Sequence, residues 1–480
     1  MTTGFRAQDA VGHAGERWRA DVLPLLEEFA RIPNLSPDFD PGWQDAGHMD
    51  RAADLMADWA STRDLPGATV EVVRLEGLTP TVLVDIPASD PTVPGTILFY
   101  GHIDKQPPFD GWTGGRGPWE PVVEGDWLYA RGVADDGYAL PTTLLAVESV
   151  RAAGGHHGRV VVLAEGSEES GSPHLPAVLE AMVERIGTPD VVLALDSGSP
   201  TYDRLWVTTS LRGVLVGTLT VRVLGHGVHS GEAGGIVPSS FRIARMLLDR
   251  LEDAATGDLL LPELVVDPPP WALDAAREHA AAVDGAGSGD SPFPLVDGLE
   301  LEGVDEADRA LRNAWRGAVA VVGADGMPPP ADAGSVLRPF TSLKLVVRIP
   351  PTCDPGAASA AVARALTADP PFGAEVTWEA GQAAGGWAAT PIAPWLAESL
   401  DDASRATFGH GTARLGEGGT IPFMGWLAER FPEAQVLAAG VLGPGSNAHG
   451  PDEGLHLLTA ARLCGSLALL LDAHAGRSDA

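Results

Sequence analysis

Apolar residues in the first two hundred positions alternate between two spacings. Segments 18–32, 48–62 and 139–155 carry them at helical intervals. Four short runs are apolar almost throughout, as buried strands are: 81–87, 96–100, 159–166 and 190–198. Strands alternating with helices predict an α/β sheet covered on both faces. Functional side chains are then expected at the carboxyl ends of the strands.

The pattern changes after about residue 210. Apolar and polar residues now alternate, as in half-exposed strands, at 214–225, 340–351 and 374–381, with a helical segment at 239–253. We interpret the Gly- and Pro-rich segments 281–298 and 323–334 as irregular surface segments. Helical spacing returns at 390–409 and 455–476. The chain therefore predicts an α/β domain formed by residues 1–209 and 389–480, interrupted by a smaller α+β domain at 210–388.

Composition excludes several classes of partner. With 65 Asp and Glu against 32 Lys and Arg, the formal charge of -33 repels nucleic acids and anionic lipid surfaces. Cys353 and Cys464 are too few for a disulfide framework or a thiolate zinc site. The N-terminal residues contain no apolar signal-peptide core, and no stretch approaches the roughly 20 uninterrupted apolar residues of a membrane span. We expect a cytoplasmic protein.

Side chains able to bind metal follow four of the first-half strands: His102 and Asp104, Asp135 and Asp136, Glu168 and Glu169, and Asp196. His449 lies in a Gly-rich loop near the C-terminus. Singly, each has an ordinary explanation, since a His at a strand end is usually structural and Asp or Glu there is commonly a helix N-cap. Together they form a mixed nitrogen and oxygen set suited to zinc or another borderline divalent ion.

The adjacent pair Glu168 and Glu169 supports the metal interpretation. Like charges repel, and burying them is costly. The pair becomes tolerable if one carboxylate binds a cation and the other acts on water bound to it. Competing motifs, namely H-E-x-x-H, G-x-S-x-G and the P-loop, are absent from the sequence.

Several segments, in order, carry a resemblance to a known family: YGHIDKQP, ARGVADD, EGSEESGSP, LALDSG, LRG, GVHSGEAGG, SVLRPFTSLKLVVRIPP, EGGTIP and SNAHGPDE. The chain resembles the M20 family of metallopeptidases, most of all its carnosinase-like cytosolic dipeptidases. The resemblance implies a mixed-sheet α/β catalytic domain of the di-zinc peptidase type, with an inserted α+β domain that acts as lid and dimerisation domain.

The resemblance also implies roles for the candidate ligands. His102 and Asp196 would hold one divalent ion, Glu169 and His449 the other, and Asp135 would bridge both. Zinc is the expected metal and manganese an alternative. Glu168 would be the general base. Asp104 would fix the tautomer of His102, as metal-bound histidines usually require.

Further positions would bind substrate. By resemblance, His229 reaches the active site of the partner subunit in a homodimer, although a plain Gly-rich turn explains it equally well. Arg348 would bind the substrate's terminal carboxylate, the alternative being an exposed charge at a strand end. The remaining pocket positions are Ser335, Gly418, Gly419 and Thr420.

The sequence departs from the family pattern in three places. Where relatives usually read Asp-Asn-Lys-Gly or Asp-Asp-Lys-Gly, this chain has Gly137 in place of the lysine and Tyr138 in place of the glycine. Relatives often have a His shortly before a Trp at the end of the inserted domain, but here Gln382 precedes Trp387. The final loop reads HGPDE instead of the commoner His-Ser-x-Asn-Glu. The first two departures bear on substrate preference.

The expected activity is metal-dependent hydrolysis of dipeptides that have a free C-terminal carboxylate. The alternative within the same family is an amidohydrolase that acts on N-acyl or N-carbamoyl amino acids. An alternative from another class is a catalytically silent binding protein, and the intact Glu168 and Glu169 pair argues against it. No nucleic acid or membrane partner is expected.

Overall fold

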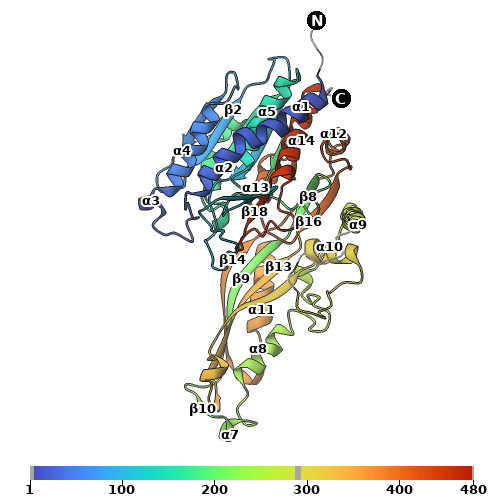
Figure 1. The fold of residues 1–480 in the computed structure, drawn as a ribbon. Helices are drawn as coiled ribbons and strands as arrows, with labels where there is room; N and C mark the ends of the chain where they lie inside the picture. Colours follow the sequence, from blue (N-terminus) through green and yellow to red (C-terminus); the bar gives the residue numbers. More distant parts are fainter. Residues whose placement is uncertain (1–4, 287–292, 294, 478–480) are drawn as a thin grey trace.

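A computed structural model describes residues 5–286, 293 and 295–477. Its largest sheet has nine strands in the order β1-β2-β6-β3-β7-β17-β8-β15, with β16 beside β8 (Figure 1). These strands are β1 (Thr69–Val73), β2 (Thr81–Ile86), β3 (Thr96–His102), β6 (Arg159–Glu165), β7 (Val191–Ala194), β8 (Trp206–Leu211), β15 (Trp387–Ala388), β16 (Ala413–Glu417) and β17 (Gln435–Ala438). Strands β6, β3, β7 and β17 are parallel, whereas β1, β2 and β15 pair antiparallel. The predicted mixed α/β sheet is confirmed.

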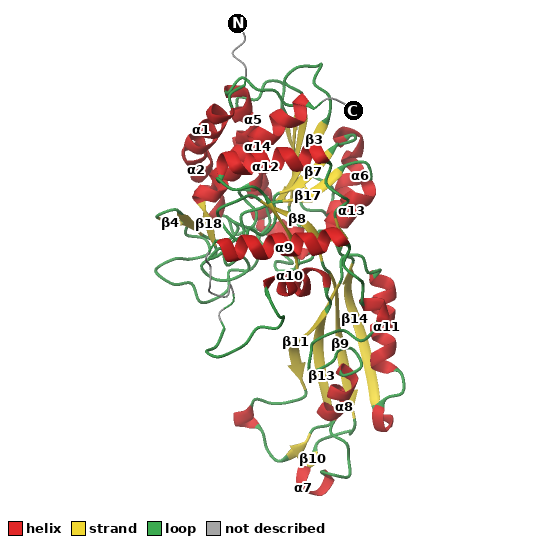
Figure 2. Ribbon diagram, turned by 90° about the vertical axis from the view of Figure 1, so that its right-hand side faces the viewer, coloured by secondary structure: helices red, strands yellow, loops and turns green. Residues whose placement is uncertain are grey.

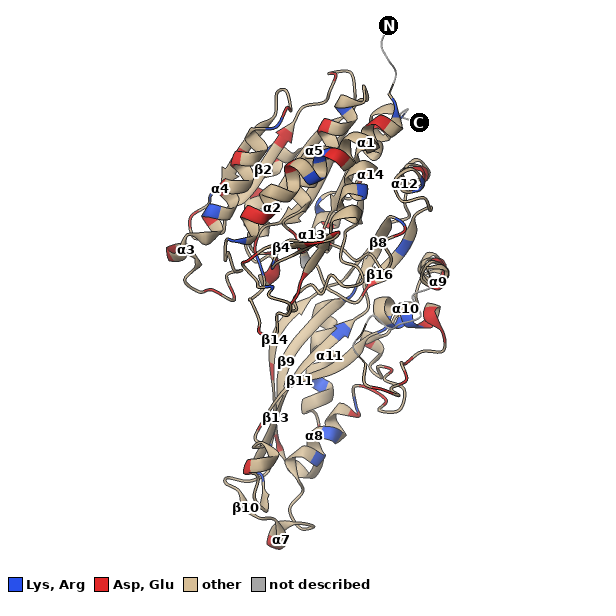
Figure 3. Cartoon of the chain, viewed as in Figure 1, with Lys and Arg blue, Asp and Glu red and all other residues tan. Residues whose placement is uncertain are grey.

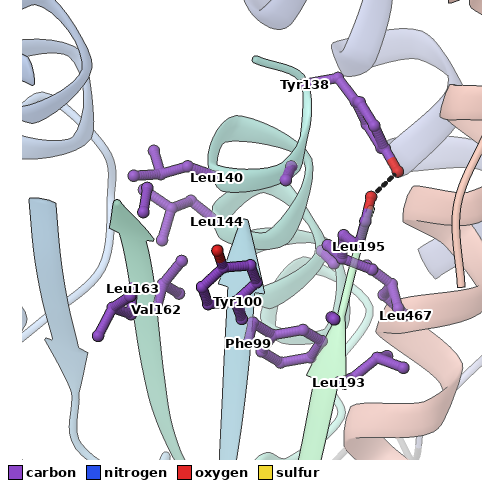
Figure 4. Packing of buried hydrophobic residues seen from close by; sticks show 14 of the residues in the cluster. Phe99, Tyr100, Tyr138, Leu140, Leu144, Val162, Leu163, Leu193, Leu195 and Leu467 are labelled. Atoms are coloured by element: carbon purple, nitrogen blue, oxygen red, sulfur yellow. Dashed lines mark hydrogen bonds between the residues drawn. The ribbon is translucent and has the colours of Figure 1, made fainter. Parts of the chain in front are cut away.

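Helices cover both faces of this sheet. Figure 2 shows α5, α12 and α14 on one side of the strands and α6 and α13 on the other. The helices are α1 (Ala7–Arg17), α2 (Leu23–Ala30), α3 (Trp43–Ala46), α4 (His48–Ser61), α5 (Ala139–Ala152), α6 (Leu175–Ile186), α12 (Pro394–Thr407), α13 (Pro422–Arg430) and α14 (Leu457–Gly476). A π-helical turn, Trp18–Val22, begins the predicted helix at 18–32. Most buried apolar side chains of these strands and helices form one core, part of which is drawn in Figure 4.

Among the described residues, α14 is the one helix whose length and composition would allow it to cross a membrane. It packs instead against α1, α5 and α12. Its Leu463, Leu467 and Leu471 are buried in the core. The apolar sequence of α14 is therefore explained by packing inside the molecule.

A second, antiparallel sheet extends away from the first, in the order β11-β13-β9-β14. It comprises β9 (Gly213–Arg222), β11 (Ala318–Asp325), β13 (Phe340–Ile349) and β14 (Glu375–Ala384), with α8 (Ser240–Leu248) and α11 (Pro355–Thr367) packed on it. At its far end lie β10 (Val228–His229), β12 (Val336–Leu337) and α7 (Ser230–Ala233) (Figures 1 and 2). The chain enters this part between β8 and β9 and leaves it between β14 and β15. We propose the domain boundaries 209/210, which lies inside β8, and 388/389, which lies directly after β15.

Two helices of the inserted range return to the large sheet. Helices α9 (Pro270–Gly285) and α10 (Glu306–Trp315) pack against each other and against β16. Buried Ala282 of α9 lies against Trp206 and Leu415. The prediction of irregular structure was therefore wrong for 281–285, which end α9, and for 323–325, which end β11. Residues 287–292 and 294 of the predicted irregular segment lie outside the described residues.

A three-stranded sheet joins two distant parts of the chain. It pairs β4 (Val122–Glu124) with β5 (Trp127–Tyr129), and β5 with β18 (Gly454–His456). Asp135 follows β5, and His449 precedes β18. The small sheet thus brings these two loops to the same place. Acidic residues are spread over both parts of the molecule (Figure 3).

Candidate metal centre

Three parallel strands deliver ligands to one edge of the large sheet. His102 is the last residue of β3, and it is paired in register with Glu165, the last residue of β6. The turn η2 (Glu168–Ser170) follows β6, and Asp196 follows β7 by two residues. Because neighbouring parallel strands end at the same edge, these side chains converge there, as predicted.

Asp135 lies between two imidazoles. Its Oδ1 is 3.1 Å from Nε2 of His102, and its Oδ2 is 2.9 Å from Nε2 of His449. The same Nε2 of His449 is 3.2 Å from Oε2 of Glu169. The two oxygens of Asp135 therefore face different histidines, which is the placement a bridging carboxylate requires.

Asp196 and Glu168 also lie close to His102. Oδ2 of Asp196 is 3.9 Å from Nε2 of His102. Two sets of possible metal ligands result, His102 with Asp135 and Glu169, and His102 with Glu168 and Asp196; the candidate atoms of each set lie within 4.8 Å of one another. All five predicted metal ligands, together with Glu168, meet in one place.

The electrostatics of this cluster fit a bound cation. In the described part of the chain, no Lys or Arg forms an ion pair with Asp135, Glu168, Glu169 or Asp196. Burial raises the pKa of Glu168 well above its usual value, and burial with the nearby charge of Asp135 raises the pKa of Asp196 to about 7. Burying several carboxylates together is costly, and a divalent ion would supply compensating positive charge.

The histidines support the same conclusion. Partial desolvation lowers the pKa of His449, but its imidazole donates hydrogen bonds to the carboxylates of Asp135 and Glu169, and these raise that pKa to about 11. Metal binding requires neutral imidazoles and ionised carboxylates. In the metal-free protein, the raised pKa values of His449 and Asp196 favour protons on groups that would bind metal ions. The donor set of imidazole nitrogens and carboxylate oxygens suits zinc or manganese.

Asp104 contacts His102 and also the backbone of Glu168 and Glu169, which was not predicted. The Nδ1 of His102 is 3.1 Å from the backbone oxygen of Asp104 and 3.4 Å from its Oδ1. The carboxylate of Asp104 also accepts the backbone N–H groups of Glu168 and Glu169, at 3.0 and 2.9 Å. One buried carboxylate thus contacts the imidazole and holds the turn that carries the adjacent glutamates.

Sequence reasoning missed Glu453 and Arg131. Glu453 accepts the N–H groups of Gly132, Ala134 and Asp135 at 3.0 to 3.3 Å and pairs with Nη1 of Arg131 at 2.7 Å. Nη2 of Arg131 donates to the carbonyl of Gly450 at 2.6 Å. This buried ion pair ties the turn of Asp135 to the loop of His449. Its signal in the sequence was the pair of opposite charges beside the two ligand motifs.

Glu165 was also missed. Its carboxylate accepts hydrogen bonds from Tyr100, Ser167 and Ser172, the two serines at 2.9 and 2.7 Å. Burial and the charge of Asp104 raise its pKa to about 7. Glu165 therefore anchors both ends of the turn between β6 and α6. The two serines that flank Glu168 and Glu169 were the available signal.

Most predicted substrate-binding residues lie where the two sheets meet. Nη1 of Arg348, near the end of β13, donates to Oγ1 of Thr420 at 2.8 Å. Thr420 in turn donates to the backbone oxygen of Arg212 at 2.6 Å, and Nε of Arg212 donates to the carbonyl of Gly418 at 3.4 Å. Gly419 lies exposed in the same loop. The structure therefore groups these four predicted positions.

His229 and Ser335 lie elsewhere. His229 is the last residue of β10. The backbone N–H of the next residue, Ser230, donates to the carbonyl of Ser335 at 2.9 Å. Both residues are at the far end of the second sheet (Figures 1 and 2). Within one chain the structure does not bring them to the metal ligands.

The departures from the family pattern have local explanations. A Cβ at Gly137 would meet the ring of Phe29 and the carbonyl of Gly132, so a side chain does not fit there. Lys105 fills the adjacent space, and its Nζ donates to the carbonyls of Phe29 and Ile32, each at 2.8 Å.

Gln382 lies in an irregular step of β14, between Ala380 and Ala383. A Cβ at Gly171 would be 3.4 Å from its Nε2. Bulges of this kind re-aim side chains beside active sites. Exposed Gln382 thus lies next to the turn of Glu168 and Glu169.

Comparison with known proteins defines the class. The model of peptidase family M20/M25/M40 matches residues 98–473. The chain therefore belongs to this family of metallopeptidases, hydrolases that act on peptide bonds.

Its relatives include dipeptidases. The chain is 28% identical to the cysteinylglycine-S-conjugate dipeptidase of Corynebacterium striatum, over 75% of this chain and 76% of the relative. It is 30% identical to the human Beta-Ala-His dipeptidase, over 38% of this chain and 36% of that protein. The solved structure of the dipeptidase Dug1p from Saccharomyces cerevisiae has the same fold, with a TM-score of 0.77, 20% identity, and coverage of 98% of this chain and 99% of that one.

Proposed function

We propose that this protein is a metal-dependent dipeptidase that cleaves dipeptides with a free C-terminal carboxylate. The observation that carries the proposal is Asp135, whose two oxygens face His102 and His449 within a buried cluster of carboxylates. That arrangement suits two cations that share one ligand. Of the two expected ions, His102 and Asp196 would hold one, Glu169 and His449 the other, and Asp135 both.

The bound ions, zinc or manganese, would supply an acidified water and positive charge near the scissile carbonyl. Glu168 would accept the proton of the attacking water at its carboxylate and return it to the nitrogen of the leaving amine. Burial raises the pKa of Glu168, so its carboxylate accepts a proton more readily than an exposed glutamate would. Asp104 would hold Glu168 in position through the backbone N–H of that residue.

Arg348 and Thr420 would bind the terminal carboxylate of the substrate. A guanidinium can donate two hydrogen bonds to a carboxylate, and Nη1 of Arg348 is already oriented by Thr420. Gly418 and Gly419 would allow the backbone close to the ligand.

Glu417 favours dipeptides over N-acyl substrates. Its Oε1 accepts hydrogen bonds from Ser197 and Thr208, at 3.1 and 3.2 Å, and from the N–H of Gly198. Burial raises the pKa of this carboxyl, and no Lys or Arg of the described chain pairs with it. It lies between the loop of Asp196 and Gly418, where the free α-ammonium of a dipeptide would supply the missing cation.

His229 and Ser335 would act in the site of a second chain. Their position at the far end of the second sheet supports a homodimer, in which each inserted domain reaches its partner's metal centre. His229 would then stabilise the oxyanion of the transition state. We place the enzyme in the cytoplasm, because its two cysteines are too few for the disulfide framework of many small secreted proteins.

The alternative is an amidohydrolase that acts on N-acyl or N-carbamoyl amino acids, because the same centre would cleave their amide bond. A panel of Xaa-Gly dipeptides and the matching N-acetyl amino acids separates the two activities. We expect hydrolysis of the free dipeptides and a loss of that preference in Glu417→Gln. Faster hydrolysis of the N-acetyl substrates would favour the alternative, and hydrolysis of neither by metal-loaded protein would contradict both.

A further inference from the structure

Tyr138 is buried beside the proposed metal centre. It directly follows the turn of Asp135 and precedes α5, and its side chain is fully enclosed. The hydroxyl donates a hydrogen bond to the backbone carbonyl of Leu195 (Figure 4). This bond joins two segments that are 57 residues apart in the chain.

Leu195 is the residue immediately before the proposed ligand Asp196. Strand β7 ends at Ala194, and the N–H of Leu195 still donates to the carbonyl of Tyr100 at 2.9 Å. Its carbonyl lies beyond the strand ladder, and among the described residues Tyr138 provides its hydrogen bond. The phenol therefore fixes the last peptide group before Asp196.

The other end of this bond is equally well held. The N–H of Gly137 donates to the carbonyl of Gly132 at 3.0 Å, and the N–H of Ala139 donates to that of Asp136 at 3.0 Å. The carbonyl of Tyr138 accepts the N–H of Thr142 at 3.1 Å, in the first turn of α5. Tyr138 thus projects from a backbone that also carries Asp135.

We infer that Tyr138 is a positioning residue that sets the distance between the proposed ligands Asp135 and Asp196 by linking the turn of one to the strand end of the other. The inference rests on the proposed metal centre and goes beyond it. Hydrogen-bonded groups behind a ligand typically change metal affinity about 10- to 100-fold when they are removed. Tyr138 stands where the family pattern described above has a glycine.

Tyr138→Phe removes the hydroxyl and keeps the ring. The matched control is Thr142→Val on the same helix, which removes a buried hydroxyl that accepts from Nε1 of Trp18 at 3.0 Å and does not contact the centre. Zinc is removed from wild type and both variants and then titrated back against a competing chelator. Thermal unfolding of the three metal-free proteins shows whether each is folded.

We expect one of the two zinc dissociation constants to increase about 10- to 100-fold in Tyr138→Phe, which means weaker binding of that ion. Both constants should stay at wild-type values in Thr142→Val, even if the two variants lose similar stability. Unchanged constants in folded Tyr138→Phe, or an equal shift in both variants, would overturn the inference and leave the proposed function standing. A wild type that binds fewer than two zinc ions would overturn the shared metal centre and this inference with it.

Discussion

At the scale of single residues, the same carboxyl group serves different purposes according to its neighbours. Asp135 is placed between two imidazoles, and Glu169 contacts His449. Glu168, next in sequence to Glu169, belongs with His102 and Asp196. The η2 turn directs Glu169 toward Asp135 and Glu168 toward Asp196. The two adjacent carboxylates can therefore serve different ions, which explains why like charges stand side by side in the sequence.

Glutamine substitutions separate the roles of the two glutamates. Glu168→Gln preserves shape but removes the base, so kcat should fall about 10²- to 10⁴-fold while metal content is retained. Glu169→Gln should lose metal, because an amide oxygen is a weaker ligand than a carboxylate. Elemental analysis and steady-state kinetics on the same preparations measure both effects. The reverse pattern, with metal lost from the first variant only, would show that the roles are exchanged.

Most of the ligands could be predicted from the sequence because they lie at or just beyond the end of a strand with a clear apolar pattern, as His102 does at the end of β3. His449 was identified from its Gly-rich loop instead. Residues that act through a ligand's backbone could not. Glu453 is far along the chain from Asp135, whose backbone N–H donates to it. Tyr138 contacts Leu195 only because the fold brings the two segments together. Such contacts are set by tertiary structure and leave no periodic signal in the sequence.

At the scale of elements, the site depends on short turns held at the ends of parallel strands. The carboxylate of Asp104, two residues beyond β3, accepts both N–H groups at the start of the turn after β6. Glu165 binds the serines on either side of that turn. Strands β3 and β6 therefore position the two glutamates together.

Asp104→Asn should loosen this turn. An amide provides one acceptor oxygen, so at least one of the N–H groups of Glu168 and Glu169 loses its partner. We expect kcat to fall about 10- to 100-fold, together with weaker metal binding. The control Asp85→Asn alters an ion pair with Arg159 in the same sheet and should leave kcat unchanged. Wild-type kcat and metal affinity in Asp104→Asn would contradict a positioning role for Asp104.

The elements themselves were predicted well where packing follows composition. The buried strands β3 and β6 and the amphipathic α4 are examples. The prediction failed at residues 281–285, because Gly and Asp beside an alanine run suggested a loop. Contact of Ala282 with Trp206 on the large sheet favours the helix instead. The local sequence around Ala282 gives no sign that it packs against Trp206, which lies more than 70 residues earlier in the chain.

At the scale of the whole molecule, buried acidic groups make the metal-free protein sensitive to pH. Burial raises the pKa of Glu165, Asp196 and Glu453 to about 7 from ordinary values near 4. Between those limits the folded protein binds more protons than the unfolded chain, so its free energy of unfolding falls as pH rises. The net charge of -33 adds repulsion in the same direction.

The melting temperature of the metal-free protein should therefore decrease as pH rises from about 4.5 to 7. Added zinc should raise the melting temperature more at pH 7 than at pH 5, because protons compete with the metal for its ligands. Thermal unfolding with and without zinc across this range measures both trends. A metal-free protein that becomes more stable toward pH 7 would contradict this electrostatic account.

The proposed dimer predicts complementation between two inactive variants. His229→Ala should retain metal but lose about 10²- to 10³-fold in kcat, the usual effect of removing one oxyanion stabiliser. Glu168→Gln should also be inactive. A mixed dimer has one site that lacks both groups and one site that has both, so activity should return on subunit exchange. Verified exchange without recovered activity would mean that His229 does not serve the partner's site.

The number of divalent ions bound per chain tests the central claim most directly. Wild-type protein, stripped of metal, saturated with zinc and freed of excess, should contain two ions per chain by elemental analysis. Asp135→Ala should bind both ions more weakly or not at all, because this residue faces both histidines. His449→Ala should keep one ion. A saturated wild type with one ion or none, or an Asp135→Ala variant that holds two ions as tightly as wild type, would contradict a centre built on Asp135.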